Sequence, residues 1–178
     1  MSVETTAMDA TLCVRPAEAI YRKPCAEDVR KFAAVMRRED ARELKRWTGN
    51  TAEYELARAV ELSDICLLAE LPGGAMLSMF GAMRSNLLER EGVIGELSTQ
   101  EVEKHRFLFA KSSRKMFHEM ARRMPDVAEF HNYVDTEYTR AVAWIEWLGG
   151  TLTIGGAFRG VCGGVFRKFI IGNPYCKP

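Results

Sequence analysis

Apolar residues recur along this chain with two different periods. Where they come at three- and four-residue steps, they indicate amphipathic helices with one apolar and one polar face. On this pattern the sequence predicts helices at residues 27–37, 40–47, 52–62, 107–124 and 136–148. We interpret the charged residues on these helices as solvated faces. A stripe of methionine and phenylalanine on the longest helix is typical of packing against a core.

Shorter apolar runs, bounded by glycine, proline and polar residues, predict β-strands. The strands are expected at residues 20–23, 65–71, 75–83, 92–97, 129–134, 151–158 and 165–171. Pro72, Gly73 and Gly74 separate the second run from the third, which indicates a β-hairpin. A glycine-rich connection at 160–164 joins the last two strands.

The order of these elements predicts an α/β fold. Helices lie between strands, which favours a mixed sheet with helices on both faces. The strand at 92–97, the helix at 107–124 and the strand at 129–134 form a crossover, and such connections are right-handed. We expect residues 1–18 to form an irregular N-terminal arm and residues 19–178 to form a single domain.

Residues 132–150 (NYVDTEYTRAVAWIEWLGG) combine a strand end, an acidic turn and a short helix. Asp135 and Thr136 are expected to cap this helix, because their side-chain oxygens can accept hydrogen bonds from its free amides. Gly149 and Gly150 are expected to end it. The stretch therefore predicts one wall of whatever site lies at the strand end.

Composition and charge narrow the classes of partner. The chain has 178 residues, of which 47% are hydrophobic and 28% charged, enough for a packed core. The 25 Lys and Arg residues nearly balance 24 Asp and Glu residues, so the net charge of +1 gives no reason to expect nucleic acid or an anionic membrane as partner. No apolar run approaches the roughly 18–20 residues that span a bilayer.

Motifs with an established chemistry are missing from the sequence. The five cysteines are scattered and odd in number, which favours reduced thiols in a cytosolic setting over a disulfide framework. Neither the cysteines nor the three histidines show metal-ligand spacing, so no metal site is expected. The chain also lacks the GxxxxGK[ST], GxGxxG and GxSxG patterns.

The order of the elements resembles the GNAT N-acetyltransferase fold, which implies a mostly antiparallel central sheet with one splayed parallel strand pair. Individual segments look similar to the internal virion protein family of podophages, a GNAT-like group, across residues 20–171. The similar segments are MRREDARELKRWTG, SMFGAM, GELSTQEV and KSSRKMFHEMARRMPDVAEFHNYVDTEYTRAVAWIEWLGG.

The resemblance implies that acetyl-CoA binds where the two parallel strands splay, with its pyrophosphate at the start of the long helix. Active relatives carry R/Q-x-x-G-x-G/A there, but residues 104–114 contain no glycine. Side chains could replace the missing backbone contacts, although a solvated helix start explains them equally well. The candidate cofactor-binding residues are Leu97, Lys111, Ser112, Ser113, Arg114, Asn132 and Asp135.

The resemblance also implies two catalytic roles. Glu96, near the end of the third central strand, is the candidate base, because burial would raise its pKa towards a useful range. An ordinary surface glutamate is the alternative. In the GNAT helix pattern, Ile145 takes the position of the tyrosine that protonates the leaving thiolate. Tyr138, at the pattern's asparagine position, or Tyr133 nearby is the candidate substitute.

Three functions remain open on the sequence. The first is a phage-type acyl-CoA-dependent N-acyltransferase with an amine acceptor, in the cytoplasm of the host cell. The second is a non-catalytic virion or internal capsid assembly protein that contacts other virion proteins. The third is a protein that holds CoA without turnover. The missing glycines and Ile145 favour the second function, whereas Glu96 keeps the first open.

Overall fold

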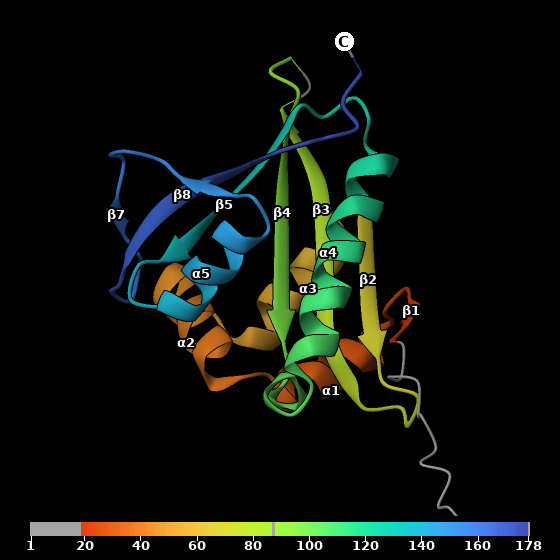
Figure 1. Ribbon diagram of the computed structural model, residues 1–178. Coiled ribbons are helices and arrows are strands. Elements are labelled where there is room, and N and C mark those ends of the chain that lie inside the picture. Colours follow the sequence, from red (N-terminus) through yellow and green to blue (C-terminus); the bar gives the residue numbers. More distant parts are fainter. Residues whose placement is uncertain (1–18, 87, 178) are drawn as a thin grey trace, which may run out of the picture.

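The computed structural model describes residues 19–86 and 88–177, so the arm expected at residues 1–18 lies outside the described residues. Within them the chain forms one mixed sheet of eight strands in the order β1-β2-β3-β4-β5-β8-β6, with β7 paired to β8 (Figure 1). The strands are β1 (Ile20–Arg22), β2 (Ile65–Glu70), β3 (Met76–Asn86), β4 (Glu91–Ser98), β5 (Glu129–Asp135), β6 (Thr151–Leu152), β7 (Phe158–Arg159) and β8 (Val165–Gly172).

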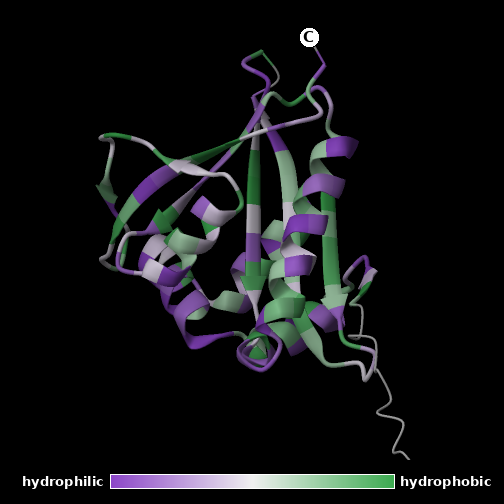
Figure 2. Cartoon of the chain, viewed as in Figure 1, coloured by the Kyte–Doolittle hydropathy of each residue, from purple (hydrophilic) through white to green (hydrophobic). Residues whose placement is uncertain are grey.

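Helices cover both faces of the sheet, as the sequence predicts. The helices are α1 (Ala26–Val35), α2 (Arg38–Thr48), α3 (Ala52–Leu62), α4 (Arg106–Arg123) and α5 (Thr139–Trp147), with a short 3₁₀ helix η1 (Gln100–Glu103) before α4. One core lies between the sheet and α4 and α5, and a second lies between the sheet and α1 and α3. In Figure 2, β2 is mostly hydrophobic and β4 is mixed, while α2 is mostly hydrophilic.

The sheet is antiparallel except at one pair of strands. β4 and β5 run parallel but pair only over Glu91–Val93 and Glu129–His131. Beyond these residues β5 continues as a partner of β8, and its ladder with β4 ends. The gap between the two strands opens in Figure 1 towards the start of α4. The predicted fold class, a mostly antiparallel sheet with one splayed parallel pair, is therefore confirmed.

Two element predictions are wrong near the C-terminal part of the chain. Residues 151–158 do not form one strand, because Gly155 and Gly156 adopt φ values of +85° and +69° between β6 and β7. Such backbone conformations interrupt a ladder. The last helix begins at Thr139 and not at residue 136. Thr136 is not its cap, because both its amide and its hydroxyl donate to the carbonyl of Val165, at 2.8 and 3.0 Å.

Helix α2 lies against the open end of β4. The amide of Arg37, at the start of α2, donates to the carbonyl of Ser98 at 2.9 Å. The carboxylate of Asp40, one turn later, accepts from both the amide and the hydroxyl of Ser98, each at 2.7 Å. Glu43 of the same helix accepts a hydrogen bond from the amide of Asp135 on β5, so α2 spans the gap between the splayed strands.

Candidate active site

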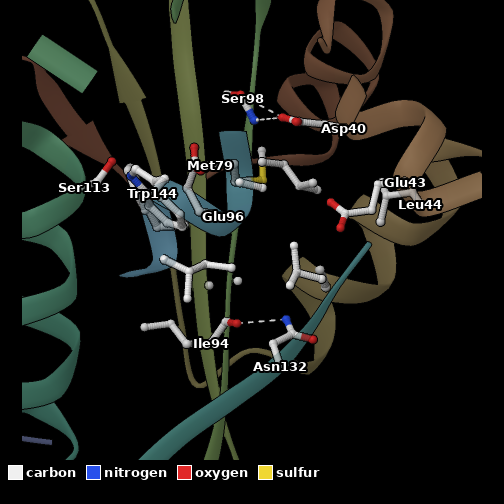
Figure 3. A pocket seen from close by; sticks show the side chains of 18 of the residues that line it. Asp40, Glu43, Leu44, Met79, Ile94, Glu96, Ser98, Ser113, Asn132 and Trp144 are labelled. Atoms are coloured by element: carbon white, nitrogen blue, oxygen red, sulfur yellow. Dashed lines mark hydrogen bonds between the residues drawn. The ribbon is translucent and has the colours of Figure 1, made fainter. Parts of the chain in front are cut away.

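A cavity of about 660 Å³ passes through the sheet where β4 and β5 splay. Leu44 of α2 and Ala59 of α3 line it on one face, and Ser113 of α4 and Trp144 of α5 line it on the other. At its narrow end the side-chain amide of Asn132 donates to the carbonyl of Ile94 at 2.8 Å. This bond bridges the two strands just past their last paired residues (Figure 3).

The carboxyl group of Glu96 lies inside this cavity without a protein partner. Glu96 lies two residues after Ile94 on the same face of β4 and opposite Phe80 of β3, so its side chain points to the face covered by α4 and α5. Its Oε1 is shielded from solvent and makes no hydrogen bond. Burial raises the pKa of Glu96 well above its ordinary value, and the charge of Asp40 raises it further.

A second orphaned polar atom faces the same space. The indole Nε1 of Trp144 is buried and has no hydrogen-bond partner. In Figure 3, Trp144 lies beside Glu96, and both side chains line the cavity. A buried donor and a buried acceptor without partners each cost about 1–3 kcal/mol. Their presence in one cavity indicates a polar ligand that would satisfy both.

Asp40 connects three elements at the open end of the splay. Besides the two bonds from Ser98, its Oδ1 accepts a hydrogen bond from the hydroxyl of Tyr138 at 2.7 Å. Burial raises the pKa of Tyr138 above its ordinary value, and the charge of Asp40 adds to that effect. Tyr138 therefore stays neutral, and its proton is directed at Asp40.

Glu43, one turn beyond Asp40 on α2, also faces the cavity (Figure 3). Burial raises its pKa to about 7, against the opposing effect of the hydrogen bond that its Oε1 accepts from the amide of Asp135 at 2.7 Å. The negative charges of Asp40 and Asp135 raise this pKa further. A carboxyl group that titrates near neutral pH suits general base catalysis.

Known proteins of similar structure share this arrangement of strands. Neither a protein-family profile nor a curated sequence matches the chain. Among solved structures, spermidine N-acetyltransferase from Vibrio cholerae in complex with CoA and spermine is similar over 88% of this chain and 96% of its own, with a TM-score of 0.64 and 13% identity. The chain has the GNAT fold.

Two further solved structures support the fold. A GNAT superfamily phosphinothricin acetyltransferase from Sinorhizobium meliloti, in complex with AcCoA, matches with a TM-score of 0.62 and 14% identity, over 90% of this chain and 92% of that one. A GNAT family acetyltransferase from Bacillus anthracis matches with a TM-score of 0.59 and 13% identity, over 88% and 96% of the two chains. At such identities the shared property is the fold.

Several residues that the GNAT resemblance selected do meet at the cavity. The lining includes Glu96, Leu97, Ser113, Asn132 and Tyr138. The hydroxyl of Ser113 nonetheless donates a hydrogen bond to the carbonyl of Phe109 within α4, at 2.8 Å. These side chains converge because β4, β5, α4 and the start of α5 meet at the splay.

The backbone of Leu97 is directed away from the gap. Leu97 pairs with Met79 in the register of β4 and β3, and neighbouring residues of a strand direct their backbone groups to opposite sides. The carbonyl of Ile94 accepts a hydrogen bond from Asn132 of β5, and the amide of Ser98 donates one to Asp40 of α2. The backbone groups of both residues therefore point away from β3. It follows that the amide and carbonyl of Glu96, and not those of Leu97, face the splay.

The other selected residues lie away from this cavity. Helix α4 already begins at Arg106, so Lys111, Ser112 and Arg114 come after the first turn, where backbone amides bond within the helix. Ser112 is buried, and Arg114 lies 5.1 Å from the ring of Trp147. Asp135 binds the guanidinium of Arg46 at 2.6 Å. None of the four lines the cavity.

Sequence reasoning missed two acidic residues of the site. Asp40 and Glu43 lie three residues apart on α2, a spacing that puts both on one face of a helix. That face also carries Leu44 and Trp47, which line the same cavity. This combination of acidic and apolar residues on one face was the available signal, but we assigned the charges to a solvated face.

The mouth of the cavity between η1 and α4 is lined by three arginines around one carboxylate. Glu103 lies 3.2 Å from Arg37, 2.6 Å from Arg106 and 3.1 Å from Arg140. Hydrogen bonding with Arg106 lowers the pKa of Glu103 below its ordinary value, and the charges of Arg37 and Arg140 contribute. Arg37, Arg106 and Arg140 stand at the starts of α2, α4 and α5, where helix dipoles also favour an anion.

Other classes of site receive no support from the described residues. Between residues 19 and 177, leaving out 87, no group of three or more His, Cys, Asp or Glu side chains is arranged to hold a metal ion. No helix within that part of the chain is both long enough and apolar enough to cross a membrane.

Proposed function

We propose that this protein is an N-acyltransferase that transfers an acyl group from a CoA thioester to an amine. The observation that carries the proposal is the cavity through the sheet, in which the unpartnered Glu96 faces one side and Glu43 faces the other. Two substrates that enter from opposite faces would meet between these carboxyl groups. The neighbours from Vibrio cholerae and Sinorhizobium meliloti, solved with CoA and spermine and with AcCoA, support this choice of substrates.

The acyl-CoA substrate fits the α4–α5 side. Its phosphates would bind at the mouth formed by Arg37, Arg106 and Arg140, where guanidinium groups and helix N-termini replace the missing glycine-rich turn. In the free protein the carboxylate of Glu103 lies between these arginines, where the phosphates would bind. The amide and carbonyl of Glu96 face the splay, and they are free to bond the thioester arm along β4.

The two carboxyl groups suit opposite roles. Because the pKa of Glu43 is about 7, part of its population is ionised at neutral pH and can accept a proton from the ammonium group of the acceptor. Burial and the charge of Asp40 raise the pKa of Glu96 well above its ordinary value, which favours the protonated form. Glu96 is therefore assigned as the acid, in place of the base predicted from sequence. Tyr138 is a positioning residue that holds Asp40.

The reaction then balances as follows. Glu43 removes one proton from the ammonium, and the free amine attacks the thioester carbonyl carbon, whose oxygen receives a hydrogen bond from the amide of Glu96. The C–N bond forms and the C–S bond breaks. The electron pair stays on sulfur, which takes the proton of the Glu96 carboxyl group. The second amine proton returns to Glu96, and Glu43 releases its proton to water.

Binding of acetyl-CoA is the first test of the proposal. Saturation at about 100 times Kd is expected to raise the melting temperature by about 5–10 °C, because the ligand binds only the folded state. Arg106→Gln should weaken binding roughly tenfold or more. Arg122→Gln is the matched control, since Arg122 is also an exposed α4 arginine that pairs with a glutamate three residues earlier. Equal loss in both variants, or no shift in the wild type, would contradict the proposed cofactor mouth.

Glu103→Gln is expected to tighten acetyl-CoA binding about fivefold. The substitution removes the negative charge that competes with phosphate for the three arginines, and such a partly exposed pair contributes about 1 kcal/mol. Isothermal titration calorimetry measures the change, with Glu101→Gln as a control in the same 3₁₀ helix. Weaker binding in the Glu103 variant would mean that Glu103 orders the arginines and does not compete with the ligand.

A non-catalytic protein that keeps the fold is the second candidate. It is favoured by one specific feature, the occupation of the phosphate mouth by Glu103 in a turn that lacks glycine. Under this alternative the protein would act in a phage particle through contacts with other virion proteins. Absence of acetyl-CoA binding, together with recovery of the protein from purified particles, would favour it over the enzyme.

A further inference from the structure

The part of the cavity on the α2–α3 face has two glycines at the centre of its floor. In the register of β3 and β4, Gly81 lies opposite Gly95, between the rungs Met79–Leu97 and Met83–Val93. All of these residues line the cavity, and Met79 and Leu97 belong to the core on the α1–α3 side. A Cβ at Gly81 would lie only 2.9 Å from the hydroxyl of Ser63, whereas one at Gly95 would meet only Asn132, so the depression between the two apolar rungs lies over Gly95. We call this part of the cavity the α2–α3 arm.

The walls of the α2–α3 arm are apolar and aromatic. They are formed by Leu44, Trp47, Ala59, Leu62 and Tyr133. The rings of Trp47 and Tyr133 lie 5.0 Å apart, which fixes this wall against β5. Leu62 is 52% exposed at the end of α3, so apolar surface is left open there. Such a lining stabilises an apolar ligand by removing its surface from water.

Charge is confined to the two ends of the arm. Asp40 and Glu43 lie at the inner end, next to the splay. The other end carries Glu55 and Arg58 of α3, whose opposite charges offset each other. Glu55 also accepts a hydrogen bond from Asn50 at 2.6 Å. Only the inner end therefore offers a net negative charge to a cation.

We propose that the α2–α3 arm binds the acceptor as a small primary monoamine with an apolar body. Its ammonium group would lie at Asp40 and Glu43, and its apolar body would rest on Gly95 between the aromatic and aliphatic walls. The proposal rests on the N-acyltransferase function and adds its acceptor class. A linear polyamine fits less well, because a second ammonium group would meet apolar walls and the guanidinium of Arg58.

Gly95→Val tests the floor directly. A Cβ at Gly95 would meet only the side-chain nitrogen of Asn132, at 3.5 Å, which is ordinary van der Waals contact. The fold therefore tolerates the substitution, while the added methyl groups fill the depression. Gly73→Ala is the control, because Gly73 lies in the β2–β3 turn with nothing within 4 Å.

Binding of 2-phenylethylamine, methylamine and spermidine is measured by calorimetry without acyl-CoA. The same three amines are then compared as acceptors by their kcat/KM with acetyl-CoA. We expect the wild type to bind 2-phenylethylamine at least tenfold more tightly than either other amine. Gly95→Val should weaken its binding about tenfold and change that of methylamine less than twofold, and Gly73→Ala should change neither. Tighter binding of spermidine, or an equal effect of Gly95→Val on both monoamines, would overturn the acceptor class. Amine binding without acetyl-CoA binding would instead contradict the proposed function alone.

Discussion

Glu43→Gln is expected to lower kcat/KM for amine acylation at pH 7 roughly 10²- to 10⁴-fold, the usual contribution of a general base. Glutamine keeps a carbonyl oxygen for the amide of Asp135, which bonds Glu43 at 2.7 Å, so the fold should persist. Only the ability to accept a proton is lost. The melting temperature and the affinity for acetyl-CoA should stay close to those of the wild type.

The pH profile separates the roles of the two carboxyl groups. If Glu43 is the base, kcat/KM of the wild type rises with pH through a midpoint near 7, because the ionised form is the active one. Glu43→Gln should remove this rise. Glu39→Gln, an exposed change on the same helix, should preserve it. A rise that survives in Glu43→Gln and disappears in Glu96→Gln would return the base role to Glu96.

Elements set by local signals were predicted well. The hairpin of β2 and β3 follows from two apolar runs and the turn at Pro72, Gly73 and Gly74, all within one short segment. The run at 151–158 misled, because its apolar residues alternate like a strand while Gly155 and Gly156 turn the backbone. The period of apolar residues does not reveal which backbone conformation a glycine adopts.

The candidate site was predicted in part, because much of it depends on contacts distant in sequence. Glu96 could be selected from its place after Gly95 near a strand end. Asp40 and Glu43 share one helix face with Leu44 and Trp47, but the contact of α2 with Ser98, 58 residues beyond Asp40, is what places that face at the site. We propose the phosphate mouth more than one turn before Lys111–Arg114, the residues that the resemblance selects, because no glycine marks the turn before α4. The 3₁₀ helix that fills this turn brings Glu103 and Arg106 to the mouth instead.

Glu96→Leu is expected to raise the free energy of unfolding by about 1–3 kcal/mol at neutral pH and to abolish acyl transfer. The stability gain follows because leucine removes a buried carboxyl group whose Oε1 has no hydrogen-bond partner. The activity is lost because, among the described tyrosines of the cavity, Tyr138 is directed at Asp40 and Tyr133 packs against Trp47 on the α2–α3 side. Urea unfolding and thiol-release assays measure the two effects.

The pH dependence of this gain identifies its cause. The pKa of Glu96 is raised in the folded protein. Below the ordinary value of 4.5 the carboxyl group is protonated in both states, and its contribution to folding stability is fully present. As pH rises above 4.5, the unfolded chain ionises first, and the wild type loses stability. The advantage of Glu96→Leu over the wild type should therefore grow from pH 4.5 upwards. Glu96→Gln, which keeps the shape, should lose transfer as well. A leucine variant with no gain at any pH would mean that water reaches the Glu96 carboxyl group, and the acid role would then lose its physical basis.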